Sequence, residues 1–327
     1  VLGEMFQNEG KSVHFIDQGF EKSSSMVAAG MYNPLVFKRI TKGWMADDFL
    51  PAAQAFYQEF ETKLGADFCR SYNILKFFPN EEYKQQWIKA KEEGNQFITD
   101  PENDFQHPYV INDFGYGRVT NVGRIVLKDM LRDYRTILKT ENRITEESFE
   151  FDQLNPAGQY KDMEFGKIVF CEGHLGVENP FFDTLPLRKT KGELLKVRVP
   201  DLDTTDLLNR GFFFVPLGNH EYLIGSTYDW KDHTYEVTEK AKKTLLQKLS
   251  KLYSGPVEIL DHTMGIRPTV KDRRPFIGYS EEHSNVGIFN GLGTKGVLLA
   301  PYLAHQFVRH TLFGEPIHPE ACITRFN

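Results

Sequence analysis

Cysteine is scarce in this chain of 327 residues, and the few that occur are widely spaced. Cys69, Cys171 and Cys322 are odd in number and form no C-x-x-C arrangement. This spacing argues against a disulfide framework and against a structural zinc site. The ten histidines show no metal-ligand spacing either, so we predict that the protein binds no metal.

Long apolar runs are also missing. No run approaches the roughly 18 residues that a membrane-spanning helix needs, and nothing at the start of the chain resembles a secretory signal. We therefore expect a cytoplasmic protein with no membrane span. The net charge of −6 disfavours a large nucleic-acid surface, although the basic segment 240–251 leaves local RNA contact open. No feature indicates an oligomeric state.

The residues that are present have clear periodicities. A hydrophobic content of 40% in a chain of this length is enough for a large core. Hydrophobic spacing predicts helices over residues 42–64, 81–93, 122–138 and 238–253. Strands are predicted over residues 211–215 and 221–224, which suggests an antiparallel sheet covered by the last of these helices.

The most informative pattern lies near the C-terminal end. A short apolar strand at 286–289 leads into a glycine loop and then into an apolar helix at 297–307. A helix that begins after such a loop points backbone N–H groups and its positive dipole end at an anion. Residues 291–296 also spell G-x-G-x-x-G, but a Rossmann unit needs a strand ending in an acid about 20 residues later. The acid at that distance, Glu315, lies in a turn, so we reject the dinucleotide fingerprint here.

The N-terminal segment supplies the acid that the C-terminal loop lacks. An apolar helical stripe over residues 1–6 is followed by a strand, 12–17, that ends in Asp17. In a βαβ dinucleotide-binding unit, a carboxylate at this strand end accepts hydrogen bonds from the adenosine ribose. The glycine loop of such a unit stands roughly 20 residues before the acid, so we expect the first strand and this loop to lie upstream of Val1. The alternative is an ordinary amphipathic helix and strand with a surface aspartate.

Taken together, these parts resemble the D-amino acid oxidase-like flavoproteins, which include glycine oxidase and sarcosine oxidase. The matching segments occur in family order over most of the chain, at residues 12–17, 23–30, 168–173, 187–194, 265–278 and 290–301. Within the family, the closest likeness is to the oxidase half of the bifunctional enzyme that modifies the tRNA wobble uridine. That likeness is carried by residues 25–34, 212–216, 225–229, 291–301 and 314–316.

The resemblance implies an α/β fold with two interleaved domains. One is a Rossmann-like FAD-binding domain, whose N-terminal strand and glycine loop are the parts expected upstream. The other is an α+β substrate domain built on an antiparallel sheet. The implied FAD-binding domain comprises residues 1–40, 115–180 and 256–327, and the implied substrate domain comprises residues 41–114 and 181–255.

The resemblance also implies which residues contact FAD. Asp17 would bind the ribose, and Ser25 and Gly30 would lie in the loop that passes the pyrophosphate and the flavin ring, where glycine allows close backbone approach. Gly173 would approach the dinucleotide in the same way. The other implied FAD contacts are Gly265, Gly291, Gly293, Thr294, Lys295 and Gly296.

Two cations are the predicted catalytic residues. Arg267 is the predicted clamp for a substrate carboxylate, because a planar guanidinium binds a carboxylate in bidentate fashion. Its alternative is a structural salt bridge with Asp272 or Asp261. Lys295 is predicted to stabilise negative charge on the flavin, and its alternative is a solvent-exposed loop lysine.

The predicted function is that of an FAD-dependent oxidoreductase that oxidises a C–N bond of an amino acid or N-substituted glycine by hydride transfer to flavin. Tyr228 and Tyr32 are the candidates to line the substrate pocket. Two alternatives stay open. One is a tRNA carboxymethylaminomethyl-uridine oxidoreductase, and the other is a flavin-free scaffold or binding protein of the same fold.

We predict that FAD is held without a covalent bond. Some sarcosine oxidase relatives tether FAD through a cysteine in the segment that corresponds to residues 265–267, and this chain has no cysteine there. Acid precipitation of the flavin-loaded protein should therefore release all of the yellow colour into the supernatant. A coloured pellet would contradict this expectation.

Overall fold

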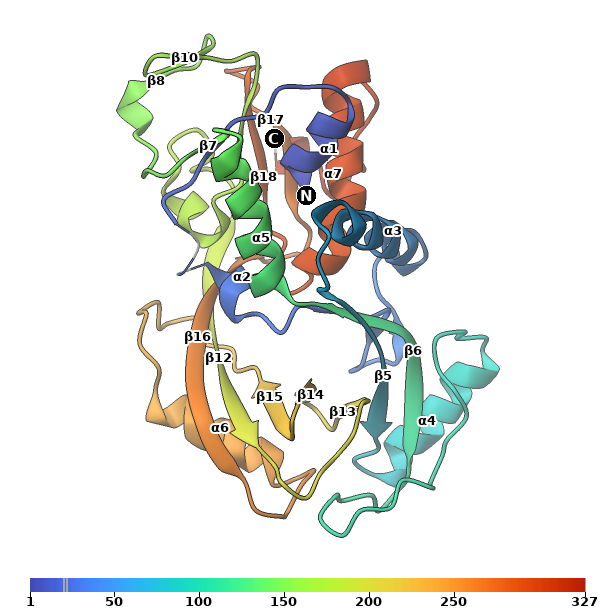
Figure 1. Cartoon of the computed structure of the whole chain (residues 1–327). Coiled ribbons are helices and arrows are strands. Elements are labelled where there is room, and N and C mark those ends of the chain that lie inside the picture. Colours follow the sequence, from blue (N-terminus) through green and yellow to red (C-terminus); the bar gives the residue numbers. More distant parts are fainter. Residues whose placement is uncertain (20, 22, 327) are drawn as a thin grey trace.

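The largest element of the computed structural model, which describes residues 1–19, 21 and 23–326, is an eight-stranded mixed sheet. Its strand order is β16-β12-β15-β14-β13-β5-β6-β2. The strands are β2 (Met31–Tyr32), β5 (Cys69–Phe77), β6 (Tyr116–Ile125), β12 (Leu187–Arg198), β13 (Leu207–Asn209), β14 (Phe213–Gly218), β15 (Glu221–Gly225) and β16 (Glu258–Val270). Figure 1 shows this sheet curling through the lower half of the molecule.

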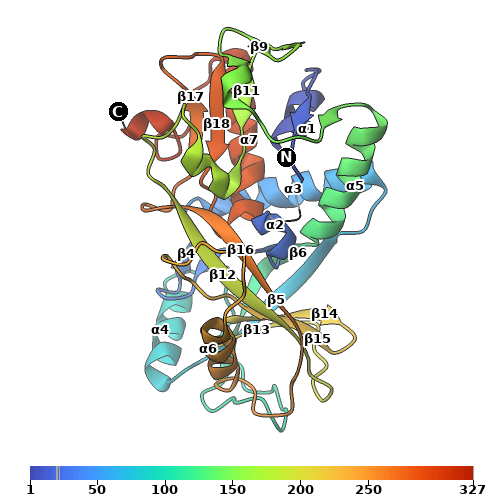
Figure 2. The ribbon, with the colours of Figure 1, turned by 90° about the vertical axis from the view of Figure 1, so that its left-hand side faces the viewer.

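The upper half contains short parallel strand pairs surrounded by helices (Figures 1 and 2). One pair is β1 (Phe15–Ile16) with β7 (Ile144–Thr145), and the other is β11 (Ile168–Phe170) with β18 (Val286–Asn290). An antiparallel strand, β17 (Phe276–Tyr279), joins the far side of β18. The helices of this half are α1 (Leu2–Asn8), α3 (Ala46–Leu64), α5 (Leu127–Thr140) and α7 (Gly296–Phe313).

The smaller elements complete the structure. The short helix α2 (Ser24–Val27) lies between the two halves (Figure 1). The remaining helices are α4 (Glu81–Glu92) and α6 (Glu239–Leu249), with 3₁₀ turns η1 (Phe151–Gln153), η2 (Gly173–Glu178) and η3 (Ile323–Phe326). Two small antiparallel sheets are formed by β3 (Leu35–Val36) with β4 (Thr41–Lys42), and by β8 (Leu154–Asn155), β9 (Gln159–Tyr160) and β10 (Met163–Glu164).

The two faces of the large sheet bury different cores. Because successive side chains of a strand point to opposite faces, Leu195 and Phe214 pack with Leu245 of α6 on one face. On the other face, Ile74 and Val215 belong to the core that includes α3 and α7. The fully buried Leu245 alone contributes roughly 1.5–3 kcal/mol to holding α6 in place. The face opposite α6 is the one that turns toward the upper half.

Helix α3 shows why the sequence forms these elements. Its apolar residues recur at helical spacing and are buried, among them Phe49, Ala53, Phe56 and Phe60. Acidic residues occupy its first turn, where they interact favourably with the helix dipole. The helix ends at Gly65, whose φ of 58° gives the left-handed cap that glycine adopts without strain.

Most predicted elements are confirmed, and one is partly wrong. The predicted helices 42–64, 81–93 and 238–253 correspond to α3, α4 and α6, and the two predicted strands to β14 and β15. The predicted helix 122–138 begins only at Leu127, since residues 122–125 lie in β6. These residues pair with β2 and β5, which are far away in the sequence, and this pairing overrides the local helical pattern.

The large sheet draws on both sets of segments that the resemblance separates. Strands β2, β6 and β16 come from segments expected in the FAD-binding domain, and the strands between β6 and β16 all come from those expected in the substrate domain. The division into two domains therefore stays a prediction. In the described part of the chain, no helix has both the length and the apolar character needed to cross a membrane.

We predict that Gly117→Ala destabilises the protein. The indole of Trp87 is fully buried, donates to the Thr99 carbonyl at 2.9 Å, and would lie 2.2 Å from a Cβ placed on Gly117. The rigid indole ring cannot easily move away from an added methyl group. Overpacking should therefore lower the free energy of unfolding by about 1–3 kcal/mol, as measured by urea titration. Gly166→Ala is the matched control because nothing lies within 4 Å of its added Cβ. Equal stability of the two variants would contradict this view of the packing.

Candidate active site

Two of the predicted glycines meet at one edge of the parallel strands. Strands β11 and β18 run in the same direction, so Gly173, after the first, and Gly291, after the second, follow the same edge. The buried Asn290 joins them, because its Nδ2 donates to the Gly173 carbonyl at 2.8 Å. In open α/β sheets this carboxyl edge is where ligands bind.

Asp17 lies at the corresponding end of β1. Its Oδ1 accepts hydrogen bonds from the backbone N–H of Gly19 and from Arg135, both at 2.8 Å. The Asp17 side chain remains 43% exposed, so it is open to a ligand hydroxyl. The role of Asp17 as the ribose acceptor stays a prediction.

The glycine loop before α7 packs against the end of β16. Gly291 has a φ of 75°, and an added Cβ would lie 2.8 Å from Val270 Cγ2. The backbone N–H of Gly293 donates to the Pro268 carbonyl at 2.9 Å. Thr294 is exposed, and Gly296 begins α7. The loop therefore connects the helix start to the strand that carries Arg267.

Lys295 caps the start of α7 and is half-buried. Burial lowers the pKa of its ammonium, and the nearby Arg273 and Arg274 lower this pKa further. Among the described residues, no carboxylate lies within ion-pair distance of it. An ammonium in such surroundings favours an anionic ligand, in contrast to a lysine extended into solvent.

Gly265 and Gly30, two of the predicted FAD contacts, have packing explanations of their own. Gly265 faces α2, where its added Cβ would lie 3.4 Å from Ser24 Cα, next to Ser25. Gly30 has a φ of 73°, and an added Cβ would lie 1.9 Å from the Ile125 carbonyl oxygen. The close approach of β6 therefore requires glycine at position 30, whether or not a ligand also lies there.

Arg267 is the cation on the inner face of the large sheet. Its Nη2 donates to Ser226 Oγ at 2.5 Å, its Nη1 donates to the Thr227 carbonyl at 3.4 Å, and its guanidinium lies 4.7 Å from the centre of the Tyr228 ring. Burial lowers the pKa of Arg267, but no carboxylate of the described chain pairs with it. Asp272, one of its two expected partners, instead pairs with Arg325 at 3.2 Å.

The two predicted pocket tyrosines are placed differently. Tyr228 contacts Arg267 and is 57% exposed, so its ring is available beside the cation. Tyr32 is 8% exposed and lies over Gly123 in the core. It belongs to β2, at the opposite end of the strand order from β16, so the structure does not bring it into contact with Arg267.

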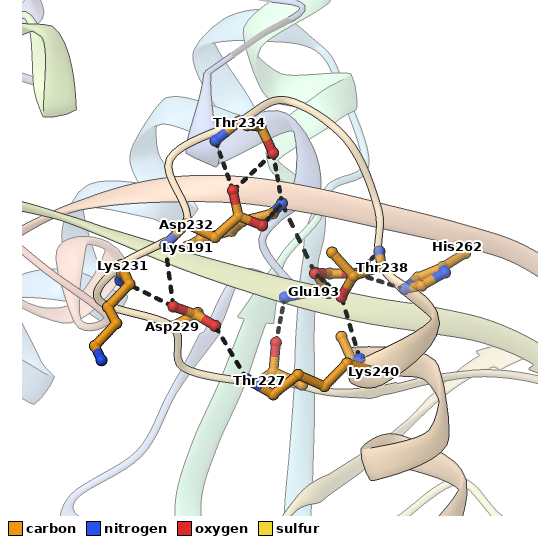
Figure 3. A network of polar contacts seen from close by, with 11 residues as sticks. Lys191, Glu193, Thr227, Asp229, Lys231, Asp232, Thr234, Thr238, Lys240 and His262 are labelled. Carbon is orange, nitrogen blue, oxygen red and sulfur yellow. Dashed lines mark hydrogen bonds and ion pairs between the residues drawn. The ribbon is translucent and has the colours of Figure 1, made fainter.

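Several residues around Arg267 were not predicted. Gly192 lies beneath the guanidinium, since an added Cβ would be 2.1 Å from Arg267 Nη2. Ser226 and Thr227 hold the guanidinium from a different segment. On the other face of β12, Lys191 and Glu193 join a polar network (Figure 3). The sequence signal for this arrangement is the pair of charged residues, Lys191 and Glu193, on either side of Gly192 in an otherwise apolar strand.

These residues fit a dinucleotide such as FAD at the strand edge. Gly173 has a φ of 60°, with no atom within 4 Å of an added Cβ, which leaves its backbone accessible. Asp17, Gly173 and the start of α7 supply a hydroxyl acceptor, an open glycine turn and backbone donors for anions. No cluster of His, Cys, Asp and Glu suited to a metal ion occurs among the residues that the structure describes.

Comparison with known proteins gives a family match. The family profile described as DAO, FAD dependent oxidoreductase, matches residues 131–309. The bifunctional protein ThiO/ThiG of Trichormus variabilis is 32% identical over 127 residues, which cover 37% of this chain and 19% of that protein. The glycine oxidase of Geobacillus kaustophilus is 30% identical over 122 residues, which cover 36% of this chain and 32% of that protein. The matched regions thus span a third or less of these relatives.

Two further similarities bear on the fold and on the alternatives. The tRNA 5-methylaminomethyl-2-thiouridine biosynthesis bifunctional protein MnmC of Marinobacter nauticus is 26% identical over 164 residues, covering 45% of this chain and 26% of that protein. The solved glycine oxidase of Bacillus cereus superposes with a TM-score of 0.81 at 16% identity, over 97% of this chain and 95% of that one. This superposition confirms the predicted fold class.

We predict that Gly192→Ala displaces the Arg267 side chain while the protein stays folded. The added Cβ would meet only the far end of a flexible side chain, which can move away. A crystal structure of the variant should show the guanidinium moved off the Tyr228 ring by about 1 Å or more, with little change in melting temperature. An unmoved guanidinium together with a large fall in melting temperature would show that the strand yields instead.

Proposed function

The chain belongs to the DAO family of FAD-dependent oxidoreductases, and from this premise we propose that it oxidises a C–N bond of a small amino acid or N-substituted glycine by hydride transfer to FAD. The observation that carries the proposal is Arg267. It is a half-buried guanidinium without a carboxylate partner in the described chain, and it lies next to the loop that opens α7. The glycine oxidases among its relatives fit this substrate class.

The protein residues bind and orient the substrate. Arg267 holds the carboxylate in a two-pronged, charge-assisted contact, and this fixes the carbon next to the amine. Tyr228 covers one side of the guanidinium and shields the contact from water. FAD, when bound, accepts the hydride. The product of this oxidation is an imine, which water hydrolyses.

In our proposal, the cofactor binds at the carboxyl edge of the parallel strands. Asp17 accepts hydrogen bonds from the ribose hydroxyls. The residues that lie beside the dinucleotide are Ser25, Gly30, Gly173 and Gly265. The start of α7, with Lys295, places positive charge where the reduced cofactor is anionic. Residues 1–40, 115–180 and 256–327 make up the FAD-binding domain in this proposal, and residues 41–114 and 181–255 make up the substrate domain.

A tRNA-directed oxidation is the second candidate, favoured by the similarity to MnmC. The basic residues that could contact RNA include Lys240 and Lys248 of α6. However, α6 packs on the face of the sheet opposite Arg267, so these lysines do not border the proposed substrate site. Binding of tRNA that weakens steeply with salt would favour this candidate. A purified protein without yellow colour would favour the flavin-free scaffold.

We predict that Arg267→Met impairs catalysis and leaves the fold intact. Methionine keeps the length but removes the charge and both donors, so transition-state binding should weaken by about 2–5 kcal/mol. This corresponds to a fall in kcat/KM of about thirty-fold to several-thousand-fold, measured with glycine, sarcosine and D-amino acids as trial substrates. Flavin content and melting temperature should change little.

The control is Arg198→Met, on the adjacent strand. Arg198 is 42% exposed and pairs with Glu221 and Glu258, far along β12 from Arg267. The Arg198→Met variant should keep kcat/KM near the wild-type value. If Arg267→Met retains normal kinetics on an accepted substrate but loses stability, Arg267 has a structural role and leaves the proposed site.

A further inference from the structure

We propose that Lys191 and Glu193 are positioning residues for Arg267, because they fix the segment that holds its guanidinium. The inference rests on the proposed role of Arg267 in binding the substrate carboxylate. The segment is 226–238, between β15 and α6, and we call it the cover segment. The charge clamp consists of Lys191 and Glu193 of β12, with His262 beside Glu193, together with their partners inside the cover segment, Asp232 and Thr238 (Figure 3).

Lys191 anchors the middle of the cover segment. The Lys191 side chain is 1% exposed, and its Nζ lies 2.5 Å from Asp232 Oδ2 and 3.2 Å from Thr234 Oγ1. Its main chain also pairs with Asp229 through two backbone hydrogen bonds of 2.9 Å. The hydrogen bond from Lys191 lowers the pKa of Asp232, and hydrogen bonds from Thr234 and the lysine charge lower this pKa further. One buried residue thus binds three positions of the segment, two through its side chain and one through its main chain.

Glu193 anchors both ends. Its carboxylate accepts the backbone N–H of Thr238 at 2.8 Å and the Thr238 hydroxyl at 2.9 Å, at the point where α6 begins. At the other end, the Glu193 backbone N–H donates to Thr227 Oγ1 at 2.9 Å. His262, from β16, lies 2.9 Å from the carboxylate and completes its surroundings. The Glu193 side chain is 4% exposed, so these partners replace its water.

The cover segment has little apolar anchorage to replace the clamp. Its four large apolar side chains are about half exposed: Tyr228 at 57%, Trp230 at 54%, Tyr235 at 46% and Val237 at 44%. Hydrophobic stabilisation scales with the area removed from water, so these side chains contribute much less than fully buried ones. The buried ion pairs and hydrogen bonds therefore hold the segment, together with the contact of 2.5 Å between the Tyr235 hydroxyl and His174 Nε2.

The position of the cover segment determines the position of the guanidinium. In the described chain, the hydrogen-bond acceptors of Arg267 and the ring beside it belong to this segment: the Ser226 hydroxyl, the Thr227 carbonyl and the Tyr228 ring. The alternation of β12 places Lys191 and Glu193 on one face of the sheet and Gly192, beneath Arg267, on the other. On the inner face of the sheet, Gly192 of β12 contacts Arg267 directly. On the opposite face, Lys191 and Glu193 act on Arg267 indirectly, through the cover segment.

The test removes the clamp from either side in the flavin-loaded protein. Lys191→Met deletes the buried charge, and Asp232→Asn deletes its partner at a position that is 28% exposed and more tolerant. Backbone hydrogen exchange of residues 226–238, followed by mass spectrometry, reports on the segment without any turnover. Each variant should exchange there about ten-fold faster or more, with exchange in α3 unchanged.

A second measurement reports on Arg267. Acetate, a carboxylate with no C–N bond to oxidise, is titrated against the flavin absorbance spectrum. Its Kd should rise about ten-fold or more in both variants. Asp232→Glu, which keeps the charge, should restore most of the affinity.

Lys196→Met is the matched control. Lys196 lies on the same strand and forms an ion pair of 2.6 Å with Glu221, which is outside the cover segment. The Lys196→Met variant should keep the wild-type hydrogen exchange of residues 226–238 and the wild-type Kd for acetate. Unchanged exchange in the two clamp variants would overturn the clamp, and faster exchange with unchanged acetate affinity would overturn its positioning role. A wild-type protein that binds no acetate would overturn the proposed function, while the exchange data would still decide whether the clamp holds the segment.

Discussion

The pairing of β12 with β16 is the constraint on which the rest of the site depends. It runs from Leu187 opposite Val270 to Arg198 opposite Glu258, with one irregularity after Lys196. This register places Arg267 on the inner face. Because the side-chain period of a strand is two residues, a slip of β16 by one residue would turn Arg267 toward α6, and a slip of β12 by one residue would bring its buried charges to the inner face.

The cations that this protein buries, fully or in part, fall into two groups, those with a carboxylate partner and those without one in the described chain. Lys191 is almost fully buried and has a carboxylate within 2.5 Å. Arg267 and Lys295 are half-buried, and burial lowers the pKa of each without a carboxylate partner in the described chain. Burying an unpaired cation costs free energy, and such arrangements concentrate at sites that bind or transform ligands. The paired cation supports structure, whereas our proposal assigns the unpaired ones to the binding of anions.

Local patterns in the sequence were reliable where neighbouring residues decide the structure. The strand, glycine loop and helix at the C-terminal end were predicted, because β18, the left-handed glycines and the apolar run of α7 are encoded within about 30 residues. Residues 122–125 were assigned to a helix because their pairing with β2 and β5 cannot be seen locally. Gly30 was predicted for its freedom near a ligand, yet the Ile125 carbonyl also requires glycine there.

By itself, the sequence determined the glycine loop before α7 and the acid at the end of β1, which follow from residue type and short-range spacing. The fold class and the choice of Arg267 followed from the family resemblance. Only the tertiary structure decided that Arg267 lacks a carboxylate partner in the described chain, that Tyr228 covers it while Tyr32 lies in the core, and that Lys191 and Glu193 hold the segment above. Those facts depend on contacts between segments far apart in the chain, and the register of β12 with β16 and the course of the 226–238 segment leave no local signature in the sequence.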